Sequence, residues 1–149
     1  MDDLDRKILT LLQRDATMPL DAIAKEVGSS KTPVWNRIRK MRDSGTITGT
    51  VALVDAEAAG LGTTFFVLVR TSQHASDWLE QFVAAVHRHP EIVSAHRLAG
   101  EIDYILKVQV ADARAFDAFY RKLIEDISIF NVTSLMSMEE IKATTELPL

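Results

Sequence analysis

The 149-residue sequence contains no cysteine and no long apolar run. Without cysteine it has no disulfide, no thiolate ligand for zinc and no cysteine nucleophile. No stretch reaches the roughly 18 consecutive apolar residues that a membrane-spanning helix needs. The N-terminus, Met1–Asp5, is acidic and lacks the apolar core of a secretory signal. We therefore expect a cytoplasmic protein with no membrane partner.

The sequence also lacks the patterns of an enzyme site. It has no glycine loop for phosphate, no nucleophile elbow and no paired acidic motif. Of the four histidines, His74, His87, His89 and His96, only His87 and His89 lie close in sequence. Their i, i+2 spacing points the two rings apart on a helix. We expect no catalytic residue, no metal site and no cofactor.

Basic residues are outnumbered by acidic residues overall but are concentrated in the first third of the chain. The net charge of the whole protein is −4. Residues 1–50 hold nine Lys and Arg against seven Asp and Glu, a net charge of +2, whereas residues 51–149 carry −6. Because phosphate contacts depend on local charge, only the first part is suited to nucleic acid.

The positive charge gathers between Ser29 and Gly45. Hydroxyl side chains begin this segment and a glycine ends it, as is common for a helix. Val34, Ile38 and Met41 recur at helical spacing, which predicts one buried side. Five basic residues and no acidic residue lie between Lys31 and Arg42. A helix that is apolar on one side and basic on the other fits a DNA groove.

Two further helices are predicted before this one, over residues 4–14 and 20–27, each with apolar residues at helical spacing. A tight glycine turn at Gly28 between the second and third helices is typical of a helix-turn-helix. Residues 46–54 are rich in Thr, Val and Ile and are predicted to form a strand.

Strands and helices alternate in the second half. The expected order is βαββαβ, a ferredoxin-like α+β domain with helices on one sheet face. Gly100-Glu101 is interpreted as a two-residue hairpin turn. The predicted strands cover residues 63–71, 92–99, 102–110 and 132–141, and the predicted helices cover 76–89 and 113–127.

The other sheet face should be rich in apolar side chains, so we expect a second copy of the chain to cover it. The apolar residues of the sheet on which this expectation rests include Phe65, Phe66, Leu68, Ile105, Leu135 and Met136. We expect a (winged) helix-turn-helix DNA-binding domain over residues 1–50. A strand linker over 51–62 leads to the ferredoxin-like domain for effector binding and oligomerisation over 63–149.

Side chains on the basic helix suit different parts of DNA. Asn36 is suited to adenine and Arg39 to guanine. We expect Lys31, Thr32 and Lys40 to contact phosphates. The predicted DNA-contacting residues are Ser30, Lys31, Thr32, Trp35, Asn36, Arg39 and Lys40.

Two residues of this helix need separate interpretation. We expect Arg37 to turn toward an acid on the first helix, so it is not counted among the base-reading residues. Trp35 is unusual on an exposed helical face. It can contact a thymine methyl group or a sugar, or form a partly buried wedge between helices.

Four segments, in this order and spacing, together resemble one family. They are Leu4-Asp5-Arg6-Lys7-Ile8-Leu9, the Ser29–Gly45 helix with Thr46-Ile47, Gly100-Glu101-Ile102-Asp103-Tyr104, and Lys142 with Thr144-Thr145-Glu146-Leu147-Pro148. Nearly end to end, the chain is similar to the Lrp/AsnC (feast/famine) family of prokaryotic transcriptional regulators. The resemblance implies an N-terminal DNA-reading domain and a C-terminal domain that binds a free amino acid. It also implies dimers, often joined as an octamer of four dimers. The variant Lys31–Trp35 resembles a sub-branch linked to cysteine or sulfur metabolism, which makes cysteine a candidate effector.

Effectors of the family commonly bind between dimers, near the loop that here is Gly100–Tyr104. A glycine-led turn presents N–H groups for a carboxylate, and Asp103 can accept from an ammonium group. Alternatively, Gly100 and Asp103 only shape the turn. The predicted effector-binding residues are Leu98, Gly100, Glu101, Asp103, Tyr104, Ser134 and Met136, the last two from a neighbouring subunit.

These features predict a homo-oligomeric, sequence-specific regulator of transcription that binds double-stranded DNA. A small amino acid at the contact between dimers would control its assembly or its DNA binding, and its expected place in the cell is the nucleoid. Two alternatives remain at this stage. One is an architectural DNA-binding protein with weak sequence preference, and the other is a ferredoxin-like small-molecule enzyme with a helical interaction module.

Overall fold

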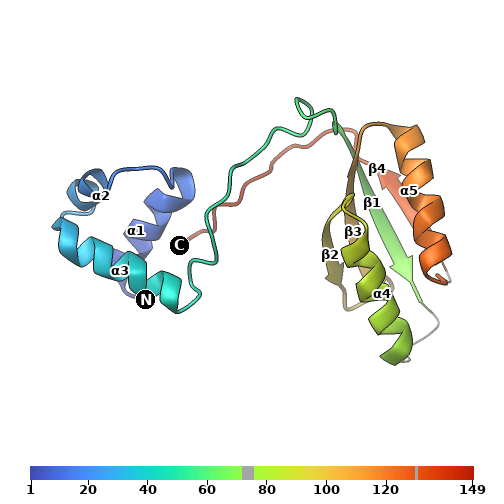
Figure 1. Ribbon diagram of the computed structural model, residues 1–149, viewed down its shortest axis with the longest axis horizontal. Helices are drawn as coiled ribbons and strands as arrows, with labels where there is room; N and C mark the ends of the chain where they lie inside the picture. The colour runs from blue at the N-terminus through green and yellow to red at the C-terminus, as the bar shows by residue number, and fades with distance from the viewer. Residues whose placement is uncertain (72–75, 130) are drawn as a thin grey trace. The chain divides into compact units, whose positions relative to one another are not determined.

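The computed structural model describes residues 1–71, 76–129 and 131–149, so His74 lies outside the described residues. The chain divides into two compact units (Figure 1). Unit 1 contains Met1–Ala52 and the C-terminal segment Ile141–Leu149, and unit 2 contains Leu53–Glu140. None of the described helices is long and apolar enough to cross a bilayer.

Unit 1 is a bundle of three helices, α1 (Asp3–Arg14), α2 (Leu20–Glu26) and α3 (Lys31–Asp43). Gly28 adopts a φ of +66° between α2 and α3, a conformation that a glycine takes without strain. The predicted helix-turn-helix is therefore confirmed. The buried apolar side chains form one core and come from all three helices: Ile8, Leu9, Ile23, Ala24, Val34, Ile38 and Met41.

The strand expected over residues 46–54, and with it a strand linker, is wrong. A strand forms only when a neighbouring backbone receives its hydrogen bonds. No strand in the described part of the chain pairs with this segment. Its apolar residues Val51, Leu53 and Val54 are accordingly 75–79% exposed.

Unit 2 contains a four-stranded antiparallel sheet and two helices. Its strand order is β2-β3-β1-β4, which confirms the ferredoxin-like arrangement. Both helices lie over the same face of the sheet (Figure 1). The elements are β1 (Thr63–Arg70), α4 (Ser76–Arg88), β2 (Ile92–Arg97), β3 (Tyr104–Val110), α5 (Ala113–Asp126) and β4 (Asn131–Met136).

The register of the sheet separates a helix-covered face from an open face. Val67 and Val69 of β1 are fully buried against the helices, and their neighbour Leu68 points to the opposite side. Leu68 pairs with Ile105, and Phe66 pairs with Leu135. The open face therefore carries an apolar patch made of Phe66, Leu68, Ile105 and Leu135.

Two of the apolar sheet residues named above, Phe65 and Met136, do not lie on the open face. They pair with each other across β1 and β4, and Phe65 is buried in the core with a ring stacked on that of Phe116 in α5. Because side chains alternate with a period of two, each lies one position out of phase with the open-face residues.

The connection between β2 and β3 is longer than the predicted two-residue turn. β2 ends at Arg97 and β3 begins at Tyr104, which leaves a loop over residues 98–103. The backbone N–H of Asp103 donates to the carbonyl of Val69 at 3.0 Å, and the Leu98 N–H donates to the Asp103 carbonyl at 2.8 Å. Pairing between the two sides of the connection therefore ends at Leu98 and Asp103, and residues 99–102 form the tip of the loop.

Candidate nucleic-acid interface and ligand loop

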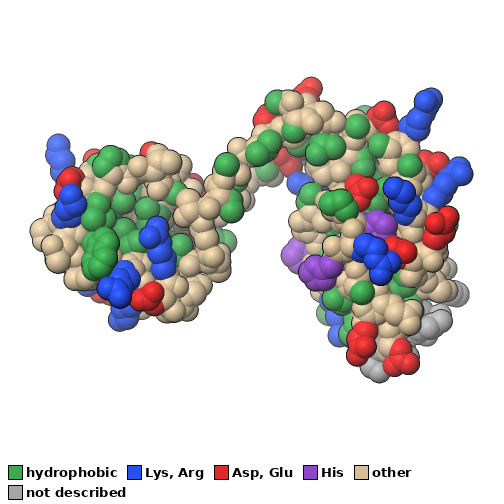
Figure 2. All heavy atoms as spheres, viewed as in Figure 1, with side chains coloured by type: hydrophobic (Ala, Val, Ile, Leu, Met, Phe, Trp, Pro, Cys, Tyr) green, Lys and Arg blue, Asp and Glu red, His purple; other side chains and the backbone are tan. Residues whose placement is uncertain are grey.

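The outward side of α3 presents the predicted DNA-contacting residues together. Val34, Ile38 and Met41 are buried and hold the helix against α1 and α2. Lys and Arg side chains gather on the side of unit 1 that carries α3 (Figure 2). All seven predicted residues are exposed there: Ser30, Lys31, Thr32, Trp35, Asn36, Arg39 and Lys40.

Arg37 does not belong to this exposed surface. Its guanidinium donates to Asp2 Oδ2 at 2.7 Å and to Asp5 Oδ1 at 2.8 Å, so the expected turn toward the first helix is confirmed. Asp2 and Asp5 also accept each other's backbone N–H groups and thereby cap the start of α1. The Arg37 pairs join α3 to α1 and set the orientation of the candidate recognition helix.

These contacts favour the charged forms of both carboxyl groups. The backbone N–H of Asp5, and after it the Arg37 guanidinium, lowers the pKa of Asp2 below its ordinary value of 3.8. The backbone N–H of Asp2, followed by Arg37, likewise lowers the pKa of Asp5. A lowered pKa in the folded state stabilises the fold above the ordinary value, and this contribution disappears as pH falls through the folded-state pKa.

We therefore expect Arg37→Met to be destabilising near neutral pH and less destabilising at pH 2. The difference in the free energy of unfolding should shrink as the pH falls below about 4, where both carboxyl groups become protonated. Denaturant unfolding, monitored by circular dichroism at each pH, measures the free energy of unfolding of the wild type and the variant. Arg42→Met, at an exposed position of the same helix, is the control. A difference that stays constant between pH 7 and pH 2 would contradict the expectation.

Lys31, expected on a phosphate, contacts a carboxylate of the neighbouring helix. Its ammonium lies 3.1 Å from Asp21 Oδ2, and both side chains are well exposed. Water screens such a pair, so it contributes little and exchanges readily. The sequence offered no signal for this contact, since the two residues belong to different helices.

The loop over residues 98–103 gathers four of the predicted effector-binding residues: Leu98, Gly100, Glu101 and Asp103. Gly100 has a φ of +150°, a conformation that side chains rarely adopt. Within the described residues, no hydrogen bond uses the backbone N–H groups of residues 99–102. The Asp103 carboxylate accepts the Thr71 N–H at 2.8 Å through Oδ2. The loop thus offers N–H donors, while Asp103 also has a structural role.

The other three predicted effector-binding residues lie elsewhere in the chain. Tyr104 is buried on the helix-covered face, with its ring centroid 4.5 Å from that of Phe82. Ser134 and Met136 share that face at β4, on the opposite edge of the sheet from β2. A single chain therefore does not bring Ser134 and Met136 to the loop.

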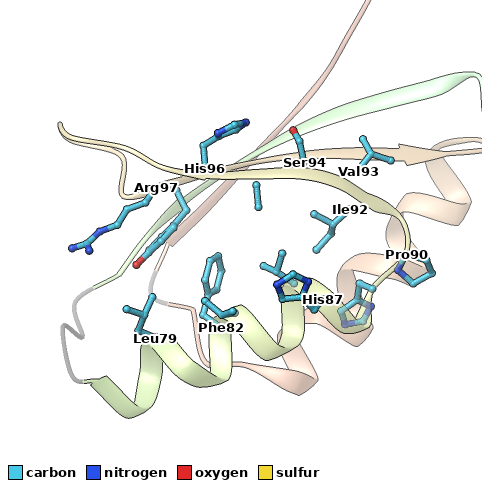
Figure 3. A pocket seen from close by; sticks show the side chains of 14 residues that line it. Leu79, Phe82, His87, Pro90, Ile92, Val93, Ser94, His96 and Arg97 are labelled. Atoms are coloured by element: carbon cyan, nitrogen blue, oxygen red, sulfur yellow. The ribbon is translucent and has the colours of Figure 1, made fainter. Parts of the chain in front are cut away.

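A groove of about 530 Å³ between α4 and β2 was not anticipated from the sequence. Leu79 and Phe82 reach into it from α4, while Arg97 lies at one end and His96 points away (Figure 3). Two apolar residues of this helix, Leu79 and Val83, are exposed. An apolar stripe too wide for one buried side was the signal that sequence reasoning missed.

The C-terminal segment makes contacts that no sequence pattern indicated. The Leu147 N–H donates to Gln13 Oε1 at 2.7 Å, and the Gln13 amide donates back to the Leu147 carbonyl at 3.3 Å. Arg14 pairs with Glu146 at 2.8 Å. The partners are more than 130 residues apart, so local periodicity carries no information about them.

Metal-ligating side chains do not converge in the described ranges 1–71, 76–129 and 131–149. No group of three or more His, Asp or Glu residues there could hold an ion.

Comparison with known families matches both units. The AsnC-type helix-turn-helix domain matches residues 1–42. The Lrp/AsnC ligand binding domain matches residues 64–147. Together the two domains account for α1 to α3 and for the sheet with its helices.

Similar proteins match over almost the whole chain. The DNA-binding transcriptional activator DecR of Escherichia coli K12 is 45% identical over 150 residues, covering 100% of this chain and 99% of that protein. The crystal structure of an AsnC family transcriptional regulator from Agrobacterium tumefaciens has a TM-score of 0.96 and 47% identity, covering 99% of this chain and 97% of that one. The transcriptional regulator NMB0573 of Neisseria meningitidis, solved as a complex with L-Met, has a TM-score of 0.93 and 32% identity, with 99% and 96% covered.

Proposed function

The chain belongs to the Lrp/AsnC family of DNA-binding transcriptional regulators, and from this premise we propose a specific mode of action. A homodimer, or a larger assembly of dimers, binds a roughly palindromic DNA site under the control of a free amino acid. Family membership makes the protein a regulator rather than an enzyme. The observation that carries the proposal is the outward side of α3, where seven candidate DNA contacts are exposed on a firmly anchored helix.

In this proposal α3 enters the major groove. Asn36 and Arg39 contact base edges, since their side chains match adenine and guanine. Lys31, Lys40 and the hydroxyl groups of Ser30 and Thr32 contact phosphates and set the register. Two copies of α3 then occupy successive major grooves, with half-sites one or two helical turns apart. DNA binding of this kind places the protein on the nucleoid in the cytoplasm.

Selection from a random duplex library with the full-length protein tests sequence-specific binding. We expect Asn36→Ala to weaken binding to the selected site by about 5- to 150-fold, or about 1–3 kcal/mol, and to relax the preference at one base pair. Lys40→Ala should instead weaken binding to all DNA sequences alike. It should also reduce the slope of the logarithm of the binding constant against the logarithm of the salt concentration by about 1. Fluorescence anisotropy at several salt concentrations separates the two variants. Equal competition by random duplex would favour an architectural protein over a specific regulator.

We further propose that the loop over residues 98–103 binds the amino acid. The unused N–H groups of residues 99–102 are suited to its carboxylate, and Asp103, helped by Glu101, is suited to its ammonium group. Leu98 and Tyr104 border its side chain, while Ser134 and Met136 approach from a neighbouring subunit. Support comes from the ligand-binding family of this unit and from the L-Met complex of the Neisseria protein.

A thermal-shift screen of the twenty amino acids, with reduced cysteine included, tests the effector. A ligand at 100 times its Kd should stabilise the protein by about 2.7 kcal/mol. We expect Asp103→Asn to lower the affinity for that amino acid at least about tenfold, since the amide keeps an acceptor for Thr71 but lacks the charge. Asp117→Asn, at an exposed position of α5, is the control. If calorimetry shows the same affinity for Asp103→Asn as for the wild type, Asp103 is not part of the site. If none of the twenty amino acids stabilises the protein, the proposal of an amino-acid effector is wrong.

The dimer in this proposal forms through the open face of the sheet. Its apolar patch has no helix over it within the described chain. A second copy can bury the same patch by two-fold symmetry, and such self-complementary contacts are the commonest form of homodimer. The family resemblance extends this to an octamer of four dimers.

A further inference from the structure

Trp35 is exposed in a way that the fold of unit 1 does not require. It is 48% exposed on the outward side of α3. The chain's other tryptophan, Trp78, is buried and donates its indole N–H to the Ser128 carbonyl at 2.8 Å. Tryptophan is usually placed to bury its large apolar body. The exposure of Trp35 also shows that it is not a wedge between helices.

The guanidinium group of Arg39 lies over the indole ring of Trp35. The guanidinium carbon of Arg39 lies 5.5 Å from the ring centroid, within the range of a cation–π contact. The two residues are four apart, so they are neighbours along one side of the helix. One turn further, Arg39 Nε is 3.8 Å from Asp43 Oδ2, a long and exposed pair that water screens. Indole, guanidinium and carboxylate thus form a row on the surface of α3.

This arrangement leaves the hydrogen-bond donors of Arg39 available. A guanidinium stacked on an aromatic ring uses its flat face and keeps its edge donors free. Arg37, two residues earlier, shows the opposite case, because its donors are occupied by Asp2 and Asp5. Reading guanine requires two parallel N–H groups directed at O6 and N7. The contact with the indole restricts the rotation of Arg39 without using the donors of that fork.

We propose that Trp35 is a positioning residue for DNA recognition, and that its indole orients Arg39 to read a guanine in the major groove. The inference rests on the proposed function, in which α3 contacts base edges. It assigns the sequence preference at one guanine to a pair of residues rather than to Arg39 alone. Trp35 acts through Arg39, and no separate base is assigned to it.

A double-mutant cycle on the full-length protein tests the pairing. The probe is the duplex selected from a random library by the wild-type protein, together with versions substituted at each base pair. We expect Trp35→Ala to weaken binding about threefold to tenfold and to flatten the preference at the same base pair as Arg39→Ala. In the Arg39→Ala background, Trp35→Ala should change the affinity by less than about twofold, because the interaction is already lost.

Two further measurements separate positioning from a general structural role. Trp35→Phe keeps an aromatic face and should restore most of the affinity and the guanine preference. The salt slope should be the same for wild type and Trp35→Ala, since no phosphate contact is removed. Melting followed by circular dichroism should show equal midpoints for these variants.

Additive effects of the two alanine substitutions would overturn the inference. So would a loss of preference at a different base pair, or full activity of Trp35→Ala. In each of these outcomes the wild-type protein still discriminates its selected site from random duplex. If the wild type does not discriminate them, the proposed function itself fails, and the inference fails with it.

Discussion

Leu135→Asp is expected to dissociate the dimer and to weaken binding to the selected DNA site by about 100-fold or more. Leu135 is 50% exposed and lies in the open-face patch, where it pairs with Phe66. In a dimer formed through that patch, the substitution would bury a carboxylate against apolar side chains without a partner, which strongly disfavours association.

The loss of DNA affinity follows from the loss of the second recognition helix. When two binding modules are linked, the second binds at a high effective concentration, which raises the overall affinity by about 10² to 10⁴. A monomer contacts one half-site and loses this gain. Light scattering measures the mass of the particle, and anisotropy with a full palindrome and with a single half-site measures binding. The variant should bind both duplexes with similar affinity.

Ile124→Asp is the matched control for this substitution. Ile124 is 45% exposed and lies on α5, in the helical layer that covers the other face of the sheet. The same carboxylate there should leave the dimer and its DNA affinity unchanged. If Ile124→Asp dissociates the dimer and Leu135→Asp does not, then the helical layer rather than the open face forms the interface.

Val34→Asp is expected to unfold unit 1 and to abolish DNA binding, while unit 2 stays folded. Val34 is completely buried in the core of the three helices. An unpaired carboxylate in an apolar core destabilises by more than about 4 kcal/mol, a large share of the stability of a small domain. Unit 2 has a separate core of strand and helix residues, so its folding should not depend on Val34.

The effect of Val34→Asp should be visible in three measurements. The helical signal in circular dichroism should fall, and fluorescence anisotropy should detect no DNA binding. The amino acid found in the screen should still raise the midpoint of the remaining thermal transition. Val51→Asp is the control, because Val51 is 79% exposed. It should leave folding and DNA binding unchanged. Loss of the effector response in Val34→Asp would mean that the two units do not fold independently.

Local patterns predicted the regular elements well, and the reason lies in particular residues. The spacing of Val34, Ile38 and Met41 located α3 and its buried side. Asp112 directly precedes the helix predicted over residues 113–127, and its carboxylate caps that helix by accepting the Ala115 N–H at 2.7 Å. Helical period and capping depend on residues within a few positions of one another, so the sequence expresses them directly.

Features that depend on distant partners were predicted less well. Residues 46–54 have strand composition but no neighbouring strand within the described chain. The sequence did not separate Phe65 and Met136 from the residues of the open face, because the face depends on the register between β1 and β4. The loop over residues 98–103 is longer than a two-residue turn, and its last residue, Asp103, bonds to Val69 and Thr71, which are distant in sequence.

The sequence by itself determined the two halves of the protein, its family, and the helix that carries the DNA-contacting residues. It did so because charge, periodicity and capping are local properties of the chain. The sequence also predicted that Arg37 turns away from DNA, but only the tertiary structure decided which acids it pairs with and which ring lies beside Arg39. Arg37 is occupied by Asp2 and Asp5, 35 and 32 residues away, whereas Arg39 lies on Trp35 with its donors uncommitted to a strong partner. Such pairings depend on how helices pack and how side chains orient, because hydrogen bonds and ring contacts require positions in space rather than positions in sequence.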